Sequence, residues 1–214
     1  MYTNVNLEAP VGALALLGTG FLIFTTAIVL IHSLIKQRKG RARVVLISMG
    51  GITAAYLIAV LVFSFASHYS LLARGEEKHF CELDCHLAYS IVNVTQSSPS
   101  TSESNQSTRT VITIKTRFDE TTISRNRGNG LLYPNSRIVT LVDDHGTRYT
   151  PTAEAGTLLT TALRPGESYT TDLIFNLPDQ ARPARLLINE GEWITHFVIG
   201  HENSPLHKKA EFQL

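Results

Sequence analysis

The sequence predicts a membrane protein with an N-terminal two-helix transmembrane hairpin followed by an all-β antiparallel domain. Three observations lead to this fold class: two long uncharged stretches, a basic cluster between them, and alternating hydrophobicity in the remainder of the chain. Of the 214 residues, 43% are hydrophobic and only 17% are charged. An ordinary soluble domain has roughly 25% charged residues. This composition excludes the fully soluble classes.

The two uncharged stretches are predicted to be transmembrane helices over residues 11–35 and 44–66, which contain no Asp, Glu, Lys or Arg. At a rise of about 1.5 Å per residue, each stretch can cross a hydrocarbon core of roughly 30 Å. A cleaved export signal would have a shorter apolar region, whereas the first stretch is followed by a basic connector and a second span. We therefore expect the lipid bilayer as a partner.

The charge distribution predicts the orientation of the hairpin. Residues 1–75 carry six basic residues and one acidic residue, whereas residues 76–214 carry thirteen basic and seventeen acidic residues. Most of the basic excess falls in the connector 36–43, at Lys36, Arg38, Lys39, Arg41 and Arg43. Such a cluster stays in the cytoplasm. We expect a multi-pass protein of the cell membrane, with the N-terminal tail 1–10 and the C-terminal domain on the periplasmic or extracellular side. A nucleic-acid partner is not expected, because so short a connector presents little surface to a duplex.

The C-terminal part is predicted to comprise a polar stalk (67–79), a β-sandwich or small barrel (80–200) with a mobile polar loop (96–108), and a C-terminal tail (201–214). In the segment 109–118, Ile112, Ile114 and Phe118 share one face, as core residues of a strand do. The Asp143–Gly146 segment is typical of a hairpin turn. The predicted strands are 87–95, 109–118, 137–142, 147–150, 168–177, 185–189 and 193–199.

Small residues in the second span predict close helix packing. Gly50, Gly51, Ala54 and Ala55 recur at spacings of four, which permits close approach of a second helix. That helix is either the first span of the same chain or a helix of a larger membrane complex. Neither span contains a charged residue, so transport through the hairpin is not expected.

The segment His79–His86 is the strongest candidate for chemistry. It places Cys81, Cys85, His79 and His86 within eight residues, and thiolate with imidazole suits copper, zinc or haem iron. Three interpretations remain open: a Cys81–Cys85 disulfide, a metal site made by these four residues, or two unpaired structural cysteines. Covalent haem attachment normally has two residues between the cysteines, whereas this chain has three.

Other candidate sites favour structural roles. Asp119–Glu120 and Asp143–Asp144 are adjacent carboxylates, and neighbours on a strand point to opposite faces. No zinc-protease helix, nucleophile elbow or phosphate-binding loop occurs in the sequence. Trp193 and Phe197 are interpreted as core residues. We therefore do not expect an enzyme.

Two resemblances add to this interpretation. From Val111 onward, the strings Leu132–Asn135, Leu141–Asp144, Leu163–Tyr169 and Phe175–Pro178 resemble an exported immunoglobulin-like β-sandwich family of unknown function. This resemblance implies an immunoglobulin-like sandwich outside the cytoplasm and carries no catalytic residues. The two-span hairpin with Cys81–x₃–Cys85 is similar in outline to subunit II of the haem-copper oxidases, which carries a dinuclear copper centre. That family has His and Met four and seven residues after its second cysteine, where this chain has Tyr89 and Val92.

These observations predict a membrane-anchored, extracytoplasmic binding or accessory subunit that is not catalytic. Its expected partners are a membrane protein complex or further copies of the chain, and no cofactor is expected. The alternative is an electron-transfer or metal-delivery protein that binds copper or haem through Cys81, Cys85 and His86.

Overall fold

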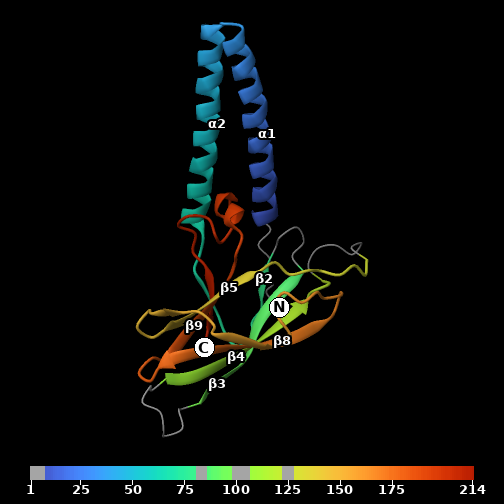
Figure 1. Ribbon diagram of the computed structural model, residues 1–214, viewed down its shortest axis with the longest axis vertical. Coiled ribbons are helices and arrows are strands. Elements are labelled where there is room, and N and C mark those ends of the chain that lie inside the picture. The colour runs from blue at the N-terminus through green and yellow to red at the C-terminus, as the bar shows by residue number, and fades with distance from the viewer. Residues whose placement is uncertain (1–7, 81–85, 98–106, 122–127) are drawn as a thin grey trace. The chain divides into compact units, whose positions relative to one another are not determined.

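The computed structural model describes the chain except for residues 1–7, 81–85, 98–106 and 122–127 (Figure 1). The described residues form two compact units. Residues 8–68 and 193–208 form one, which we call the helical unit. Residues 69–192 and 209–214 form the other, which we call the strand unit. The chain therefore leaves the strand unit after residue 192 and returns to it at residue 209.

The helical unit contains α1 (Glu8–Ile35) and α2 (Lys39–Ala66), each 28 residues long. Both are long and apolar enough to span a membrane, as the sequence predicts. The turn between them is short, because Gln37 adopts a left-handed φ of 54° and the Arg38 amide donates to the Ser33 carbonyl at 2.9 Å. Most of the predicted connector 36–43 therefore belongs to α2.

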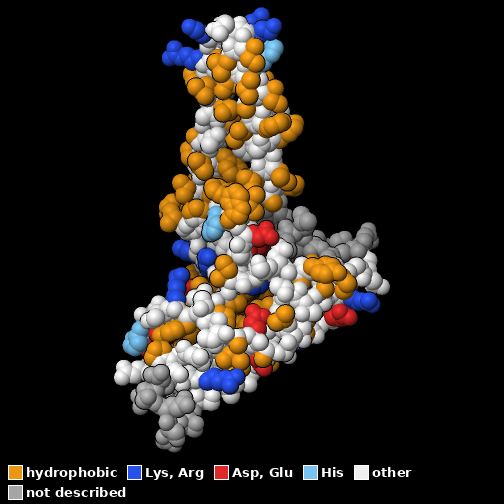
Figure 2. Space-filling view, viewed as in Figure 1, with side chains coloured by type: hydrophobic (Ala, Val, Ile, Leu, Met, Phe, Trp, Pro, Cys, Tyr) orange, Lys and Arg blue, Asp and Glu red, His pale blue; other side chains and the backbone are white. Residues whose placement is uncertain are grey.

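The surface of the hairpin is apolar along most of its length (Figure 2). Phe21, Phe24 and Phe65 each leave about two thirds of their surface exposed. Soluble proteins rarely expose an apolar area of this size. Lys and Arg side chains gather at the end that carries the α1–α2 turn. These features are consistent with membrane association.

The strand unit consists of two five-stranded sheets. The first, in spatial order, is β1 (Ser70–Leu72), β10 (Ala210–Gln213), β9 (Pro183–Glu190), β5 (Arg137–Asp143) and β6 (Arg148–Tyr149). The second is β2 (Lys78–Phe80), β3 (Leu87–Ser97), β4 (Ser107–Phe118), β8 (Ser168–Pro178) and β7 (Ala153–Gly156). Neighbouring strands are antiparallel, apart from the parallel pair β1 and β10.

One hydrophobic core draws on both sheets. In β4, alternate residues are buried, and Ile112, Ile114 and Phe118 lie in the core as predicted. Leu186 of β9 and Phe212 of β10 join the same cluster from the first sheet. The two sheets thus enclose a common interior, and the prediction of an antiparallel strand-rich domain is confirmed.

The structure corrects three predicted boundaries. The predicted stalk 67–79 contains β1 and most of β2, and the predicted tail 201–214 contains β10. The stalk was expected to be exposed because it contains charged residues such as Lys78. In the structure Lys78 is only 4% exposed, and its ammonium donates a hydrogen bond to the Ile188 carbonyl at 2.6 Å. Both ends of the segment 96–108, predicted to be a mobile loop, belong to strands, since β3 extends to Ser97 and β4 begins at Ser107; residues 98–106 lie outside the described residues.

The predicted strand 193–199 is wrong. Residues Trp193–Phe197 form a short 3₁₀ helix, η1, within the helical unit. Trp193 and Phe197 are 72% and 46% exposed, so neither is a core residue. Residues four apart share a face in a helix as well as in a strand, and the apolar spacing therefore did not distinguish the two.

Candidate functional site

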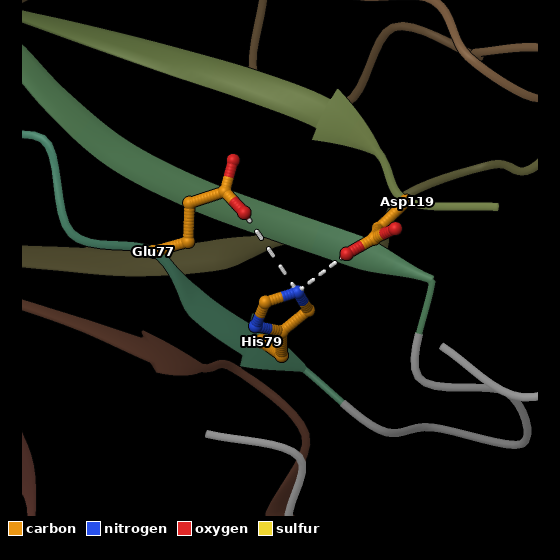
Figure 3. A group of neighbouring side chains, drawn as sticks. All are labelled: Glu77, His79 and Asp119. Carbon is orange, nitrogen blue, oxygen red and sulfur yellow. Dashed lines mark hydrogen bonds and ion pairs between the residues drawn. The ribbon is translucent and has the colours of Figure 1, made fainter. Parts of the chain in front are cut away.

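Four ionisable side chains meet at one edge of the second sheet: Glu77, His79, Arg117 and Asp119. His79 Nε2 lies 3.1 Å from Asp119 Oδ2 and 3.9 Å from Glu77 Oε2. Figure 3 shows both carboxylates pointing toward this nitrogen. Arg117 Nη2 contacts the same two oxygens, at 2.6 Å from Glu77 and 3.0 Å from Asp119. We call these four residues the charge cluster.

Strand register brings the cluster together from distant parts of the sequence. His79 of β2 pairs with Ala88 of β3, which in turn pairs with Arg117 of β4. Residues paired in this way share one face of the sheet. Their neighbours Phe80 and Phe118 point into the core, so the cluster lies on the opposite face. Because Ala88 carries only a methyl group, Arg117 can extend across it toward Glu77.

The cluster holds its carboxylates ionised. Burial alone would raise the pKa of Asp119, but hydrogen bonds from Thr121, His79 and Arg117 outweigh it and hold the pKa well below its usual range. The hydrogen bond from Arg117 lowers the pKa of Glu77. In return, the hydrogen bond to Glu77 raises the pKa of Arg117. At neutral pH, two carboxylates therefore face a permanent guanidinium cation.

Asp119 also contacts His79 and His86, the two histidines on either side of residues 81–85. Its carboxylate contacts His79, while its backbone carbonyl lies 2.7 Å from His86 Nδ1. Its amide donates to the His86 carbonyl at 2.6 Å. The His86 ring stacks on Phe118, with ring centroids 5.0 Å apart. The two histidines that flank residues 81–85 are thus fixed by a single residue after β4.

The cluster has the donor types of a metal site, but Arg117 already uses its oxygens. Ligand atoms of Glu77, His79 and Asp119 lie within 4.8 Å of one another, close enough for a single cation. The oxygens nearest His79 are those that the guanidinium contacts. A cation bound here would have to displace Arg117. Among the described residues, both carboxylates of the cluster are therefore already paired with Arg117.

The predicted metal ligands are only partly described. Cys81 and Cys85 lie outside the described residues, which give no support to the predicted disulfide. His79 and His86 are both buried, and Asp119 contacts each of them. Sequence reasoning missed Arg117 and the role of Asp119. Their spacing of two was the available signal, because residues two apart share a face of a strand.

The second carboxylate pair has the predicted structural role. Asp143 accepts hydrogen bonds from the amides of His145 and Thr147 at 3.0 and 2.7 Å. The Tyr149 hydroxyl donates to it at 3.0 Å. Gly146 has a φ of 84°, as the turn requires. Asp143 thus stabilises the hairpin between β5 and β6.

The small residues of α2 do not pack against α1. Gly50, Gly51, Ala54 and Ala55 are all exposed, and a methyl group added at either glycine would meet no atom of the described residues within 4 Å. The residues of α2 that are buried, Ala42, Val60 and Ser64, lie on a different side of the helix. This corrects the interpretation in which the small residues contact the first span of the same chain.

Comparisons of the chain with protein-family models, curated proteins and solved structures found no match. The resemblances to an exported immunoglobulin-like family and to oxidase subunit II therefore remain predictions from the sequence.

Proposed function

We propose that this protein is a membrane-anchored, non-catalytic binding or accessory subunit of a membrane protein complex. In this proposal α1 and α2 span the cell membrane, and the basic turn between them lies in the cytoplasm. The strand unit, an immunoglobulin-like sandwich, then lies on the periplasmic or extracellular side. The length and hydropathy of the helices support anchoring, and the basic residues at their turn support this orientation.

The observation on which the accessory role rests is the small-residue face of α2. Helices in lipid associate through small residues that let two backbones approach closely. Gly50, Gly51, Ala54 and Ala55 form such a face, and α1 does not cover it. A helix of another membrane protein, or of a second copy of this chain, fits this face.

In this proposal the carboxylates of the charge cluster have a structural role. A carboxylate that acts as a general acid or base usually has a pKa raised toward neutral pH. Asp119 and Glu77 have lowered pKa values and are paired with Arg117. These groups instead stabilise the edge of the second sheet at β2.

Complex formation can be tested on the tagged full-length chain, extracted from native membranes in mild detergent. We expect it to co-purify with other membrane proteins in a fixed ratio, and the double variant Gly51→Leu/Ala55→Leu to lose them. Gly18→Leu in α1 is the matched control, because a side chain at Gly18 also meets nothing within 4 Å. A particle with the mass of one chain would overturn the proposal, whereas two or more copies of this chain would identify a homo-oligomer.

The second candidate function is metal binding for electron transfer or metal delivery. The observation that favours it is His79, whose Nδ1 is buried and has no hydrogen-bond partner among the described residues. It lies two residues before Cys81. In this candidate, His79, Cys81, Cys85 and His86 bind copper or haem.

Metal binding can be tested by elemental analysis and visible absorption of the purified full-length protein. Stoichiometric copper, zinc or iron that is lost in Cys85→Ser would establish this candidate. Metal-free protein, in a preparation never exposed to chelators, would exclude it. The matched control is Ser90→Ala, because Ser90 is a buried small residue of the same sheet outside the cluster.

A further inference from the structure

Residues 193–208 have an inside-out distribution of polarity. Four polar side chains are almost fully buried: Thr195, His201, Asn203 and Ser204. Four apolar side chains are exposed: Trp193 at 72%, Leu206 at 65%, Ile194 at 47% and Phe197 at 46%. In a segment surrounded by water, the opposite distribution is the rule.

Hydrogen bonds within the segment satisfy the four most deeply buried of its polar side chains. Asn203 donates from Nδ2 to the Thr195 hydroxyl at 3.0 Å, and its carbonyl lies 2.6 Å from His196 Nδ1. The Ser204 hydroxyl donates to the Val198 carbonyl. Irregular backbone is tolerated at membrane depth only where it is buried in protein or lines a water-filled cavity.

The segment docks along the helical hairpin rather than beyond its ends. Tyr56 donates its hydroxyl hydrogen to the Phe197 carbonyl at 2.7 Å. Trp193, Ile194 and Phe197 line one side of an open groove of about 610 Å³, and Leu17, Phe21 and Phe24 of α1 line the other. All six of these side chains are hydrophobic. Within η1, the Trp193 and Phe197 rings meet edge to face, with centroids 6.0 Å apart.

Helix geometry places this groove inside the span. At about 1.5 Å per residue, Leu17 lies about 9 Å and Phe24 about 20 Å along the axis from Val11, where the apolar stretch of α1 begins. Tyr56 lies about 15 Å from Ala66, the end of α2. If the helices cross a bilayer, η1 is therefore level with the hydrocarbon of the leaflet that is opposite the basic turn.

We infer that residues 193–208 form a re-entrant membrane element, and that phospholipid acyl chains fill the groove between η1 and α1. This inference rests on the proposed membrane anchoring. The acyl chains pack against Trp193, Ile194 and Phe197, while Thr195, Asn203 and Ser204 remain hydrogen-bonded within the segment. A close contact holds it in place: a methyl group at Gly12 would collide with the Ile199 carbonyl.

The chain offers a direct test, because Trp193 is its only tryptophan. The full-length protein is reconstituted in phosphatidylcholine vesicles with or without brominated acyl chains, and Trp193 emission is measured. We expect strong quenching by the brominated lipid and weak quenching by acrylamide in the aqueous phase. Quenching by acrylamide alone would place Trp193 in water and overturn the inference. Quenching by neither agent would show that protein covers the groove, which also overturns it.

A second variant separates this inference from the proposed anchoring. In Trp193→Phe/Leu22→Trp the only tryptophan lies on α1, at an exposed position level with the groove but not among its lining residues. Quenching of this variant by brominated lipid, together with an unquenched Trp193, would refute the re-entrant element alone. Absence of lipid quenching in both proteins would refute the anchoring itself.

Discussion

Asp119 provides the sharpest test of the charge cluster, through the substitution Asp119→Asn. The carboxylate accepts hydrogen bonds from the Thr121 amide and hydroxyl at Oδ1, and it contacts His79 and Arg117 at Oδ2. An asparagine can keep the first pair through its single carbonyl oxygen. Its NH₂ group must then face the N–H groups of Arg117, so the contact with Arg117 is lost.

The expected loss of stability follows from these contacts. A hydrogen bond to a charged group contributes about 1.5–3 kcal/mol, and Asp119 is only 3% exposed. Arg117 is partly exposed and keeps its bond to Glu77, which reduces the cost. We therefore expect the free energy of opening of the β2 edge to fall by about 2–4 kcal/mol. That change accelerates amide hydrogen exchange about 30- to 700-fold.

Hydrogen exchange of the full-length protein in detergent measures this change in the β2 and β3 amides. Glu120→Gln is the matched control, because Glu120 is exposed and one residue away; a surface change of this kind costs within about 0.5 kcal/mol. Equal exchange rates in Asp119→Asn and the control would refute the claim that Asp119 stabilises the β2 edge of the sheet.

Three further predictions follow from the described contacts. Because the folded pKa of Asp119 is depressed, the stability that it contributes is complete above about pH 5 and is lost progressively as the pH falls further. The difference between wild type and Asp119→Asn in the free energy of opening should therefore narrow in acid. Gly12→Ala should displace residues 193–208 and change Trp193 emission, whereas Gly18→Ala, which meets no neighbour, should leave the emission unchanged. Tyr56→Phe removes the hydrogen bond to Phe197 and should weaken docking of the same segment by about 0.5–1.5 kcal/mol, seen as faster exchange there and not in β4.

The sequence was informative where burial follows a simple period. Alternation in 109–118 and 168–177 predicted β4 and β8 to within two residues at each end, because both strands bury one face against the core. The uncharged stretches predicted α1 and α2 for an equally simple reason. By contrast, β1 and β10 are short strands that pair with each other in parallel across about 140 positions of sequence, and no local pattern encodes such a pairing.

The charge cluster shows a different limit. His79 was singled out because it precedes Cys81, but its actual partners are Asp119 and Glu77. Asp119 was interpreted together with its neighbour Glu120, which is exposed, whereas Asp119 is buried. Finding the cluster required the register that aligns His79, Ala88 and Arg117 across three strands. That register depends on two successive strand pairings, which together bring His79 beside a residue 38 positions later in the sequence.

Residues 193–208 make the strongest case that hydrophobicity must be interpreted together with the surrounding medium. Trp193 and Phe197 were predicted to be buried, because in water an apolar pair at the end of a β domain gains free energy by joining the core. If α1 and α2 span a membrane, as we propose, that gain disappears beside them, since acyl chains are as apolar as a protein core. The segment's polar groups then determine its conformation: Thr195, Asn203 and Ser204 must pair internally, and the apolar side chains are left to face outward. A strand prediction fails here because a lone strand would leave its backbone groups unpaired, whereas η1 and the turns that follow satisfy theirs locally.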